Sequence, residues 1–230
     1  MEWSKQLDEY CERLGPDFWA EPVNAISNLS FIIGAVLAFR IGRQCNAHTL
    51  GSYWLTSILF FIGIGSFIYH TFATLLGMFL DMLPIYIFQL SFVVLYGAVI
   101  ARQMGARPLW GSLALLGFFV VLTLGFMQFP SDMLNGSITY LSAWVCLLFA
   151  GLYHALTFTT RRFTLLLAAI CLAISLSFRS IDMAVCESWG LGTHFVWHLL
   201  NGLTLYLSIR AYMDSTQASN RVAAAAAQIP

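Results

Sequence analysis

The chain contains 230 residues, of which 59% are hydrophobic and only 10% are charged, whereas soluble domains usually carry about 25% charged residues. Its formal net charge is zero and it lacks a cluster of Lys and Arg side chains, so we expect no nucleic acid partner. Apolar stretches of the length that crosses a bilayer as a helix, about 20 residues, recur along the chain. The composition therefore predicts an all-α membrane protein and argues against an ordinary soluble domain.

Taken in chain order, seven apolar segments bounded by charged residues, Pro or Gly predict a bundle of seven transmembrane helices. The connections between them are short, so residues 1–217 should form one seven-helix domain. Residues 218–230 are small and low in complexity, and we expect a flexible C-terminal tail there. The expected spans are residues 23–40, 51–70, 79–101, 108–128, 137–157, 163–181 and 192–212.

The basic residues predict the orientation of the helices, because cytoplasmic loops are enriched in Lys and Arg. Most of the Arg residues follow odd-numbered spans, which places the N-terminus outside and the C-terminus in the cytoplasm. We therefore expect an integral multi-pass membrane protein, of the plasma or inner membrane if the source is bacterial, with no obligate protein partner. The residues that carry this bias are Arg40, Arg43, Arg102, Arg107, Arg161, Arg162, Arg210 and Arg221.

A group of polar residues stands out against this apolar background. His194 and His198 are four residues apart at the start of the last span, so both imidazoles project from one face of a helix. His70 ends the second span with Ser66 one turn before it, and Asp81 opens the third span. By the predicted topology all five residues reach the same, non-cytoplasmic leaflet.

Such a group is suited to catalytic zinc, which takes three protein ligands and keeps a water in its fourth position. His70, His194 and His198 are the candidate ligands. Asp81 is the candidate general base for the bound water, and Ser66 is placed to orient that water or to donate to a developing oxyanion. The alternative is that the histidines form ordinary hydrogen bonds between helices, with Asp81 paired to one of them.

The spacing of these five residues resembles that of the alkaline ceramidase family, which belongs to a wider group of membrane hydrolases that includes adiponectin receptors. A Ser four residues before a His, an Asp eleven residues after that His, and a late HxxxH pair form the family pattern. The segment EPVNAISNLSF also looks like the family's N-terminal E-x-x-N-x-x-S-N-L signature. The resemblance implies a seven-helix zinc amidase in which Asp81 and Ser66 hold the attacking water, and a membrane lipid substrate, ceramide or another N-acyl lipid.

The resemblance also implies a calcium ion held by the N-terminal segment. Glu9, Glu12 and Glu21 of the acidic stretch DEYCERLGPDFWAE supply the hard oxygen donors that Ca²⁺ prefers. However, Leu14 stands where the family would place an amide ligand. The alternative is that the stretch is simply an acidic, solvated outer surface.

The cysteines divide according to the predicted topology. Cys45 falls in a cytoplasmic loop and Cys146 and Cys171 fall in spans, which leaves Cys11 and Cys186 on the outside. An oxidising exterior permits these two to pair. The family resemblance also suggests a bond between the N-terminal segment and the loop before the last span, so we predict a disulfide between Cys11 and Cys186.

Two further residues are candidates for contact with a substrate head group. Arg179 lies near the outer end of the sixth span, where the alternative is a local pair with Asp182. Trp197 precedes His198, where the alternative is an interfacial aromatic residue. The functions that stay open are a ceramidase, a hydrolase of another N-acyl or ester lipid, and a receptor or transporter with a structural metal.

Overall fold

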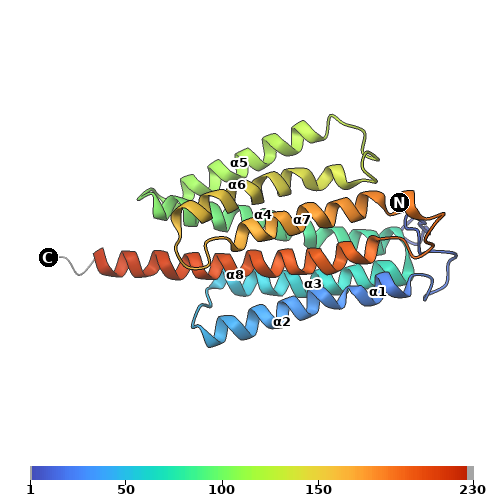
Figure 1. Ribbon diagram of the computed structural model, residues 1–230, viewed down its shortest axis with the longest axis horizontal. Coiled ribbons are helices and arrows are strands. Elements are labelled where there is room, and N and C mark those ends of the chain that lie inside the picture. Colours follow the sequence, from blue (N-terminus) through green and yellow to red (C-terminus); the bar gives the residue numbers. More distant parts are fainter. Residues whose placement is uncertain (1, 227–230) are drawn as a thin grey trace.

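The apolar segments of the sequence fold into long helices that lie side by side in one bundle (Figure 1). The structure is a computed structural model and describes residues 2–226. Within these residues there is no β-strand, and the bundle is all-α. The α-helices are α1 (Pro22–Ser27), α2 (Leu29–Gln44), α3 (Leu50–Phe72), α4 (Leu75–Gln103), α5 (Pro108–Phe126), α6 (Leu141–Thr157), α7 (Thr164–Ile181) and α8 (His194–Ala226), with 3-10 helices η1 (Ser137–Tyr140) and η2 (Met183–Val185).

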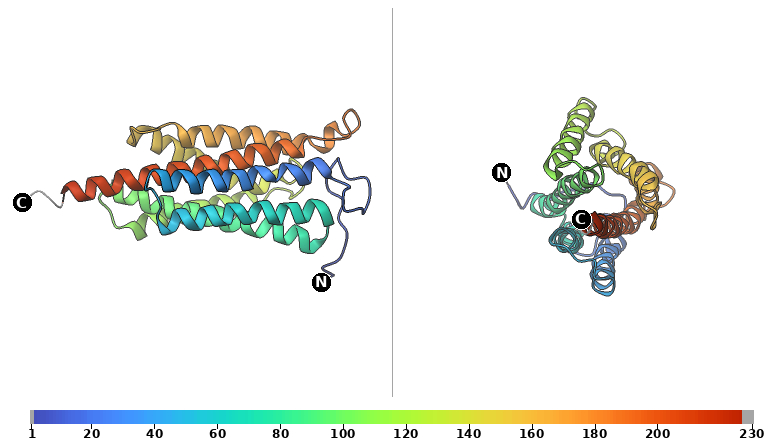
Figure 2. Two further views of the ribbon diagram at one scale, coloured as in Figure 1. Left: turned by 90° about the horizontal axis from the view of Figure 1, so that it is seen from below. Right: turned by 90° about the vertical axis from the view of Figure 1, so that its left-hand side faces the viewer.

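Among the described residues, six helical segments are long and apolar enough to cross a membrane. They coincide with the first six predicted spans, and α1 and α2 together form the first of them. The seventh predicted span coincides with the start of α8, which is more polar than the others because it carries two histidines and an asparagine in its first turns. This helix packs against α7, α2, α3 and α4, and the end view in Figure 2 shows it among the other helices.

The described part of α8 extends to Ala226. Residues 218–226 are therefore helical, where the sequence predicts a flexible tail, and residues 227–230 lie outside the described chain. The helix continues because Ala is the best helix former and the stretch contains no Pro or Gly to stop it.

A tight connection between α3 and α4 positions the end of one helix beside the start of the next. Ala73 adopts a positive φ of 45° that ends α3, and the side chain of Thr74 accepts the backbone N–H of Gly77 at the start of α4. Gly65 of α3 packs against the backbone of Leu80, and a Cβ atom there would collide with the Leu80 carbonyl. The missing side chain thus lets the two helices approach one another next to Ser66 and Asp81.

The N-terminal segment, residues 2–21, crosses the end of the bundle at which α3 ends and α8 begins (Figure 2). Backbone hydrogen bonds attach it to the α3–α4 connection, with Leu7 N 2.7 Å from Ala73 O and Leu75 N 3.0 Å from Lys5 O. The predicted disulfide between Cys11 and Cys186 is confirmed, with the two Cα atoms 5.4 Å apart. The segment is therefore attached to the α3–α4 connection by hydrogen bonds and to the loop before α8 by the disulfide.

Candidate metal centre

Three histidines converge at the bundle end beneath the N-terminal segment. His70 lies in the last turn of α3, and His194 and His198 occupy the first two turns of α8. Their ring centroids are 4.6 to 5.1 Å apart, and one nitrogen of each ring lies within 4.8 Å of the others. All three side chains are buried. Residues distant in sequence thus form a compact set of nitrogen donors.

Hydrogen bonds to the outer nitrogens orient two of these rings. Nδ1 of His70 lies 2.6 Å from Oε2 of Glu21, and Nδ1 of His198 lies 2.7 Å from Oγ of Ser27. The Ser27 hydroxyl donates its own proton to the carbonyl of Asn24, at 2.7 Å, so its oxygen accepts from His198. Both histidines therefore carry their proton on Nδ1 and present the lone pair of Nε2. Histidine ligands of metals are held in this way.

The remaining polar atoms in the centre have no partner. Nε2 of His70, Nδ1 of His194 and Oδ1 of Asp81 are all buried and make no hydrogen bond within the described structure. Because buried polar groups are nearly always satisfied, three such atoms in one place fit a bound cation and its water. Neutral imidazoles are donors that suit zinc. The residues present therefore fit a metal ion.

Ser66 lies one turn before His70 on α3, and Asp81 of α4 lies close enough to His70 to interact with it. Both are buried, and the Ser66 side chain lies next to the Asp81 carboxylate. Within the described residues, the donors close enough to share one ion are the three histidines, and Asp81 is not part of that group. A metal ion held by the three histidines would therefore have no fourth protein donor in this group.

Asp182 fixes the start of α8 and hence His194. Its buried carboxylate accepts the backbone N–H groups of His194 and Thr193, at 2.9 and 2.6 Å, and that of Cys11 at 3.1 Å. The first two are donors that the beginning of a helix leaves free. Gly192 has a positive φ of 64°, and a side chain there would collide with this carboxylate. One acidic residue thus joins the N-terminal segment to the first turn of α8.

Tyr10 covers the histidines from the side of the N-terminal segment. Its ring centroid lies 3.8 Å from that of His194 and 5.0 Å from that of His70, and the residue is buried. Burial raises the pKa of the Tyr10 phenol above its usual value, so the hydroxyl stays protonated at physiological pH. Tyr10 therefore shields the centre from the outside without adding a charge.

The three glutamates that the resemblance assigns to calcium each have other partners. Glu9 accepts a hydrogen bond from the Tyr69 hydroxyl, and Glu12 accepts two backbone N–H groups at the start of α1. Glu21 pairs with the buried guanidinium of Arg13 as well as with His70. Within the described residues they do not form a group of three donors around one ion.

Arg13 is a buried cation beside Glu21. Its guanidinium also donates to the carbonyls of Gly15 and His70, at 2.9 and 3.1 Å. The negative charge of Glu21 is therefore balanced by a side chain of the protein itself. The acidic stretch is also not simply a solvated surface, because Glu12 and Glu21 are buried.

Arg179 and Trp197 lie together next to the centre, and the structure contradicts the alternative expected for each. Arg179 donates to the backbone of Asn135 and to the hydroxyl of Ser137 rather than pairing with Asp182, whose carboxylate accepts backbone N–H groups. Its guanidinium lies 5.9 Å from the ring centroid of Trp197. Trp197 is buried, so it is not an interfacial aromatic residue facing lipid.

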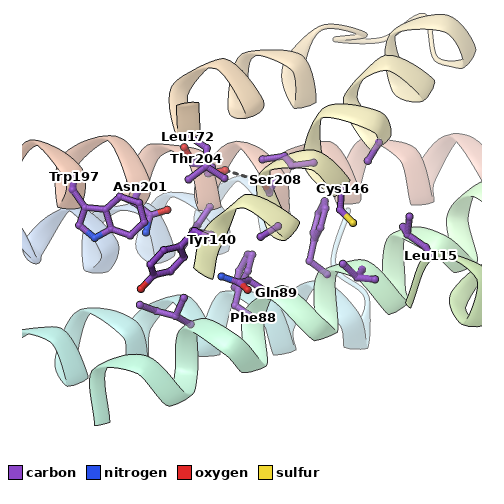
Figure 3. A pocket seen from close by; sticks show the side chains of 17 residues that line it. Phe88, Gln89, Leu115, Tyr140, Cys146, Leu172, Trp197, Asn201, Thr204 and Ser208 are labelled. Atoms are coloured by element: carbon purple, nitrogen blue, oxygen red, sulfur yellow. Dashed lines mark hydrogen bonds between the residues drawn. The ribbon is translucent and has the colours of Figure 1, made fainter. Parts of the chain in front are cut away.

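A largely apolar cavity begins next to these aromatic residues and extends into the bundle between α4, α6, α7 and α8 (Figure 3). Trp197 and Tyr140, whose ring centroids are 5.0 Å apart, form part of its wall. The residues deeper in the cavity include Phe88, Phe92 and Leu172. The cavity therefore lies close to the candidate metal centre along α4 and α8, and its wall is suited to hydrocarbon.

Sequence reasoning identified the three histidines that the structure brings together, but it missed residues that contact them. Glu21 accepts a hydrogen bond from His70, and Ser27 accepts one from His198. The spacing of Glu21, Asn24 and Ser27, three residues apart, would have predicted one polar face on a short helix. The contacts of Asp182, by contrast, leave no pattern in the sequence because they are long-range.

No protein-family model matches the chain, and comparison with curated proteins finds no significant match.

Proposed function

We propose that the chain is a membrane-embedded hydrolase in which His70, His194 and His198 bind a catalytic zinc ion. The observation that carries the proposal is the set of three imidazoles whose inner nitrogens lie within 4.8 Å of one another. The hydrogen bonds that Nδ1 of His70 and Nδ1 of His198 donate to Glu21 and Ser27 support it, because they leave Nε2 of both rings unprotonated. Asp81 would then be a residue that acts on the bound water, since its buried Oδ1 has no other partner.

We further propose seven transmembrane spans, with α8 as the seventh. The N-terminus would then lie outside, the C-terminus would lie in the cytoplasm, and the metal centre would face the non-cytoplasmic leaflet. The Arg residues that follow odd-numbered spans support this orientation. The disulfide between Cys11 and Cys186 also supports it, because disulfides persist in oxidising compartments.

A zinc ion held by three histidines lowers the pKa of its bound water to about 7 and polarises a substrate carbonyl. The side chains divide the remaining tasks. Asp81 accepts a proton from the attacking water and returns it to the leaving amine. Ser66, beside Asp81, donates a hydrogen bond to the oxygen on which negative charge develops. Tyr10 restricts access of bulk water from the outer side.

The adjoining apolar cavity supports a lipid as the substrate, because a hydrocarbon chain can occupy it while the reacting bond lies at the metal. An amide of the ceramide type, cleaved to a long-chain amine and a fatty acid, is the substrate that the family resemblance favours. Hydrolysis of another N-acyl or ester lipid is the second candidate. A receptor or transporter with a closed, structural metal site would be expected to have a fourth protein ligand.

Purified protein tests this proposal directly. We expect one zinc ion per chain by elemental analysis, and amide hydrolysis that a chelator abolishes and added zinc restores. His198→Ala should lose both metal and activity, and Asp81→Asn should keep the metal and lose activity. His48→Ala is the matched control, since His48 lies outside the centre and should change neither property. Protein that binds no zinc, or an active His198→Ala variant, would contradict the proposal.

A panel of substrates then identifies the lipid class. Ceramides, other N-acyl lipids and ester lipids of matched chain length should be compared with the wild type. Faster cleavage of ceramides would support the ceramidase assignment. Preference for another lipid would retain the hydrolase and replace its substrate.

A further inference from the structure

Two carboxylates of the N-terminal segment are buried where this segment crosses the bundle end (Figure 2). They belong to Glu12 and Glu21. A buried carboxylate is costly unless hydrogen bonds or a positive charge compensate for the water that it loses. The attachment of the segment to the bundle therefore depends on the groups that meet these two side chains.

Donors of the protein itself occupy most of these carboxylate oxygens. The two oxygens of Glu12 accept the backbone N–H groups of Val23 and Asn24, each at 2.8 Å. Both N–H groups belong to the first turn of α1, where a helix leaves such groups free and favours a negative charge. Oε2 of Glu21 accepts from Nδ1 of His70 at 2.6 Å and from Nδ2 of Asn24 at 3.1 Å. Only Oε1 of Glu21 remains for a further partner.

Arg13 supplies a positive charge at this last oxygen. Its Nε donates to Oε1 of Glu21, and its two terminal nitrogens donate to the carbonyls of Gly15 and His70, at 2.9 and 3.1 Å. Each nitrogen of the guanidinium thus has an oxygen partner, and Arg13 is only 5% exposed. A carboxylate and two backbone carbonyls are also the kind of oxygen donors that hold a hard metal ion. In this chain they surround a side-chain cation.

We propose that Arg13 is the fixed cation that holds the N-terminal segment over the bundle end, in place of a bound metal ion such as calcium. Its neighbour Leu14, at which the family resemblance expects an amide ligand, is 93% exposed and adds no side-chain oxygen to this set. Calcium takes about six to eight oxygen ligands. Three oxygens in the plane of a guanidinium fit Arg13 better than they fit such an ion.

An arginine and a bound ion differ in how they respond to their surroundings. The guanidinium stays protonated at every physiological pH and is covalently part of the chain. A bound ion dissociates when its concentration falls below its dissociation constant. The segment carries Tyr10, which covers His194, and Glu21, which accepts a hydrogen bond from His70. With Arg13 as the cation, neither of these contacts should depend on calcium.

Thermal unfolding of the full-length protein in detergent tests the proposal without any variant. Calcium is added to desalted protein, and magnesium at the same ionic strength is the control. No chelator is used, because it would also remove zinc. We expect elemental analysis to find no bound calcium and the unfolding temperature to be the same with either ion. Bound calcium, or a saturable rise with calcium alone, would overturn the proposal. Arg13 makes these contacts whether or not the histidines bind zinc, so this outcome is independent of the proposed hydrolase.

Two variants then test whether the oxygens around the guanidinium can hold a metal ion. Arg13→Asn removes the charge and adds an amide oxygen, whereas Arg13→Met removes the charge and fills the space with an apolar chain. Both should unfold at a lower temperature than the wild type. Calcium at about ten times its dissociation constant should raise the unfolding temperature of Arg13→Asn by about 3 °C or more and leave that of Arg13→Met unchanged. Stabilisation of both variants by calcium, or of neither, would overturn the proposal. The wild-type result decides alone if the variants do not fold.

Discussion

Replacing Glu21 with Gln tests whether the hydrogen bond behind His70 sets the affinity for metal. The Glu21 carboxylate lies 2.6 Å from Nδ1 of His70, and both side chains are almost fully buried. Gln keeps the size of the side chain but removes the charge that holds the Nδ1 proton and makes Nε2 a better donor. Comparable substitutions weaken metal binding about 10- to 100-fold, which corresponds to roughly 1.4 to 2.7 kcal/mol.

A second variant controls for the other role of Glu21. The same carboxylate pairs with Arg13, so Glu21→Gln also loosens the N-terminal segment. Arg13→Met removes that ion pair and leaves the bond between Glu21 and His70 in place. We expect Arg13→Met to lower the unfolding temperature, because it leaves a buried carboxylate without its strongest partner. Its zinc affinity should change by less than about threefold.

The measurement is a zinc dissociation constant, obtained by competition with a chromophoric chelator in detergent micelles at one pH. The reasoning predicts a clear drop in affinity for Glu21→Gln and a small one for Arg13→Met. Wild-type affinity in Glu21→Gln would refute it. Equal losses in both variants would also refute it, because they would show that the N-terminal segment as a whole, and not the hydrogen bond, controls the metal.

Four further outcomes are expected. Ser27→Ala should weaken zinc binding about 2- to 10-fold in the same competition assay, because only a neutral hydrogen bond to His198 is lost. Asp182→Asn should destabilise the protein by about 2 kcal/mol or more in a denaturation experiment, since it weakens three hydrogen bonds to one charged group. Cys186→Ser should cost about 2 to 5 kcal/mol, seen as a lower unfolding temperature without reductant and no further change with it. Burial alone would raise the pKa of Glu21, but its hydrogen bonds lower that pKa below 4.5. The ionised Glu21 carboxylate therefore stabilises the folded protein. This stabilisation should be complete above pH 4.5 and should be lost as the pH falls through the lower pKa of Glu21 in the folded state. Glu21→Gln should not show that loss.

Much of the fold could be predicted from the sequence, because hydrocarbon and water impose strong demands on composition. Each of the six apolar helical segments lies where a predicted span lies, with ends shifted by a few residues. The bundle end that holds His70, His194 and Asp81 followed from the direction in which successive helices run. Low complexity suggested a flexible tail from residue 218 onward, whereas residues 218–226 continue α8 because the run of Ala residues favours a helix.

The details of the centre were harder to predict, because they depend on which side chains meet after folding. The family resemblance assigned Glu21 to calcium, and only the structure shows that the Arg13 guanidinium pairs with this carboxylate. A pair between Arg179 and Asp182, three residues away, was the alternative to a role of Arg179 in substrate contact, but Asp182 bonds to three backbone N–H groups instead. Local spacing carries no information about such distant donors.

The way in which Asp182 joins Cys11 to His194 has a consequence for how the protein matures in the cell. The metal centre combines the N-terminal segment, the end of α3 and the first turns of the last helix, so a chain still being synthesised lacks two of its three histidines. A partly inserted chain exposes at most His70, which alone cannot hold zinc tightly. Loading of the proposed metal should therefore follow insertion of α8. Chains truncated before residue 194 should then reach the membrane without metal. The hydrogen bonds from Cys11 and His194 to Asp182 can form only after α8 has been made, so they form at the same stage as the centre.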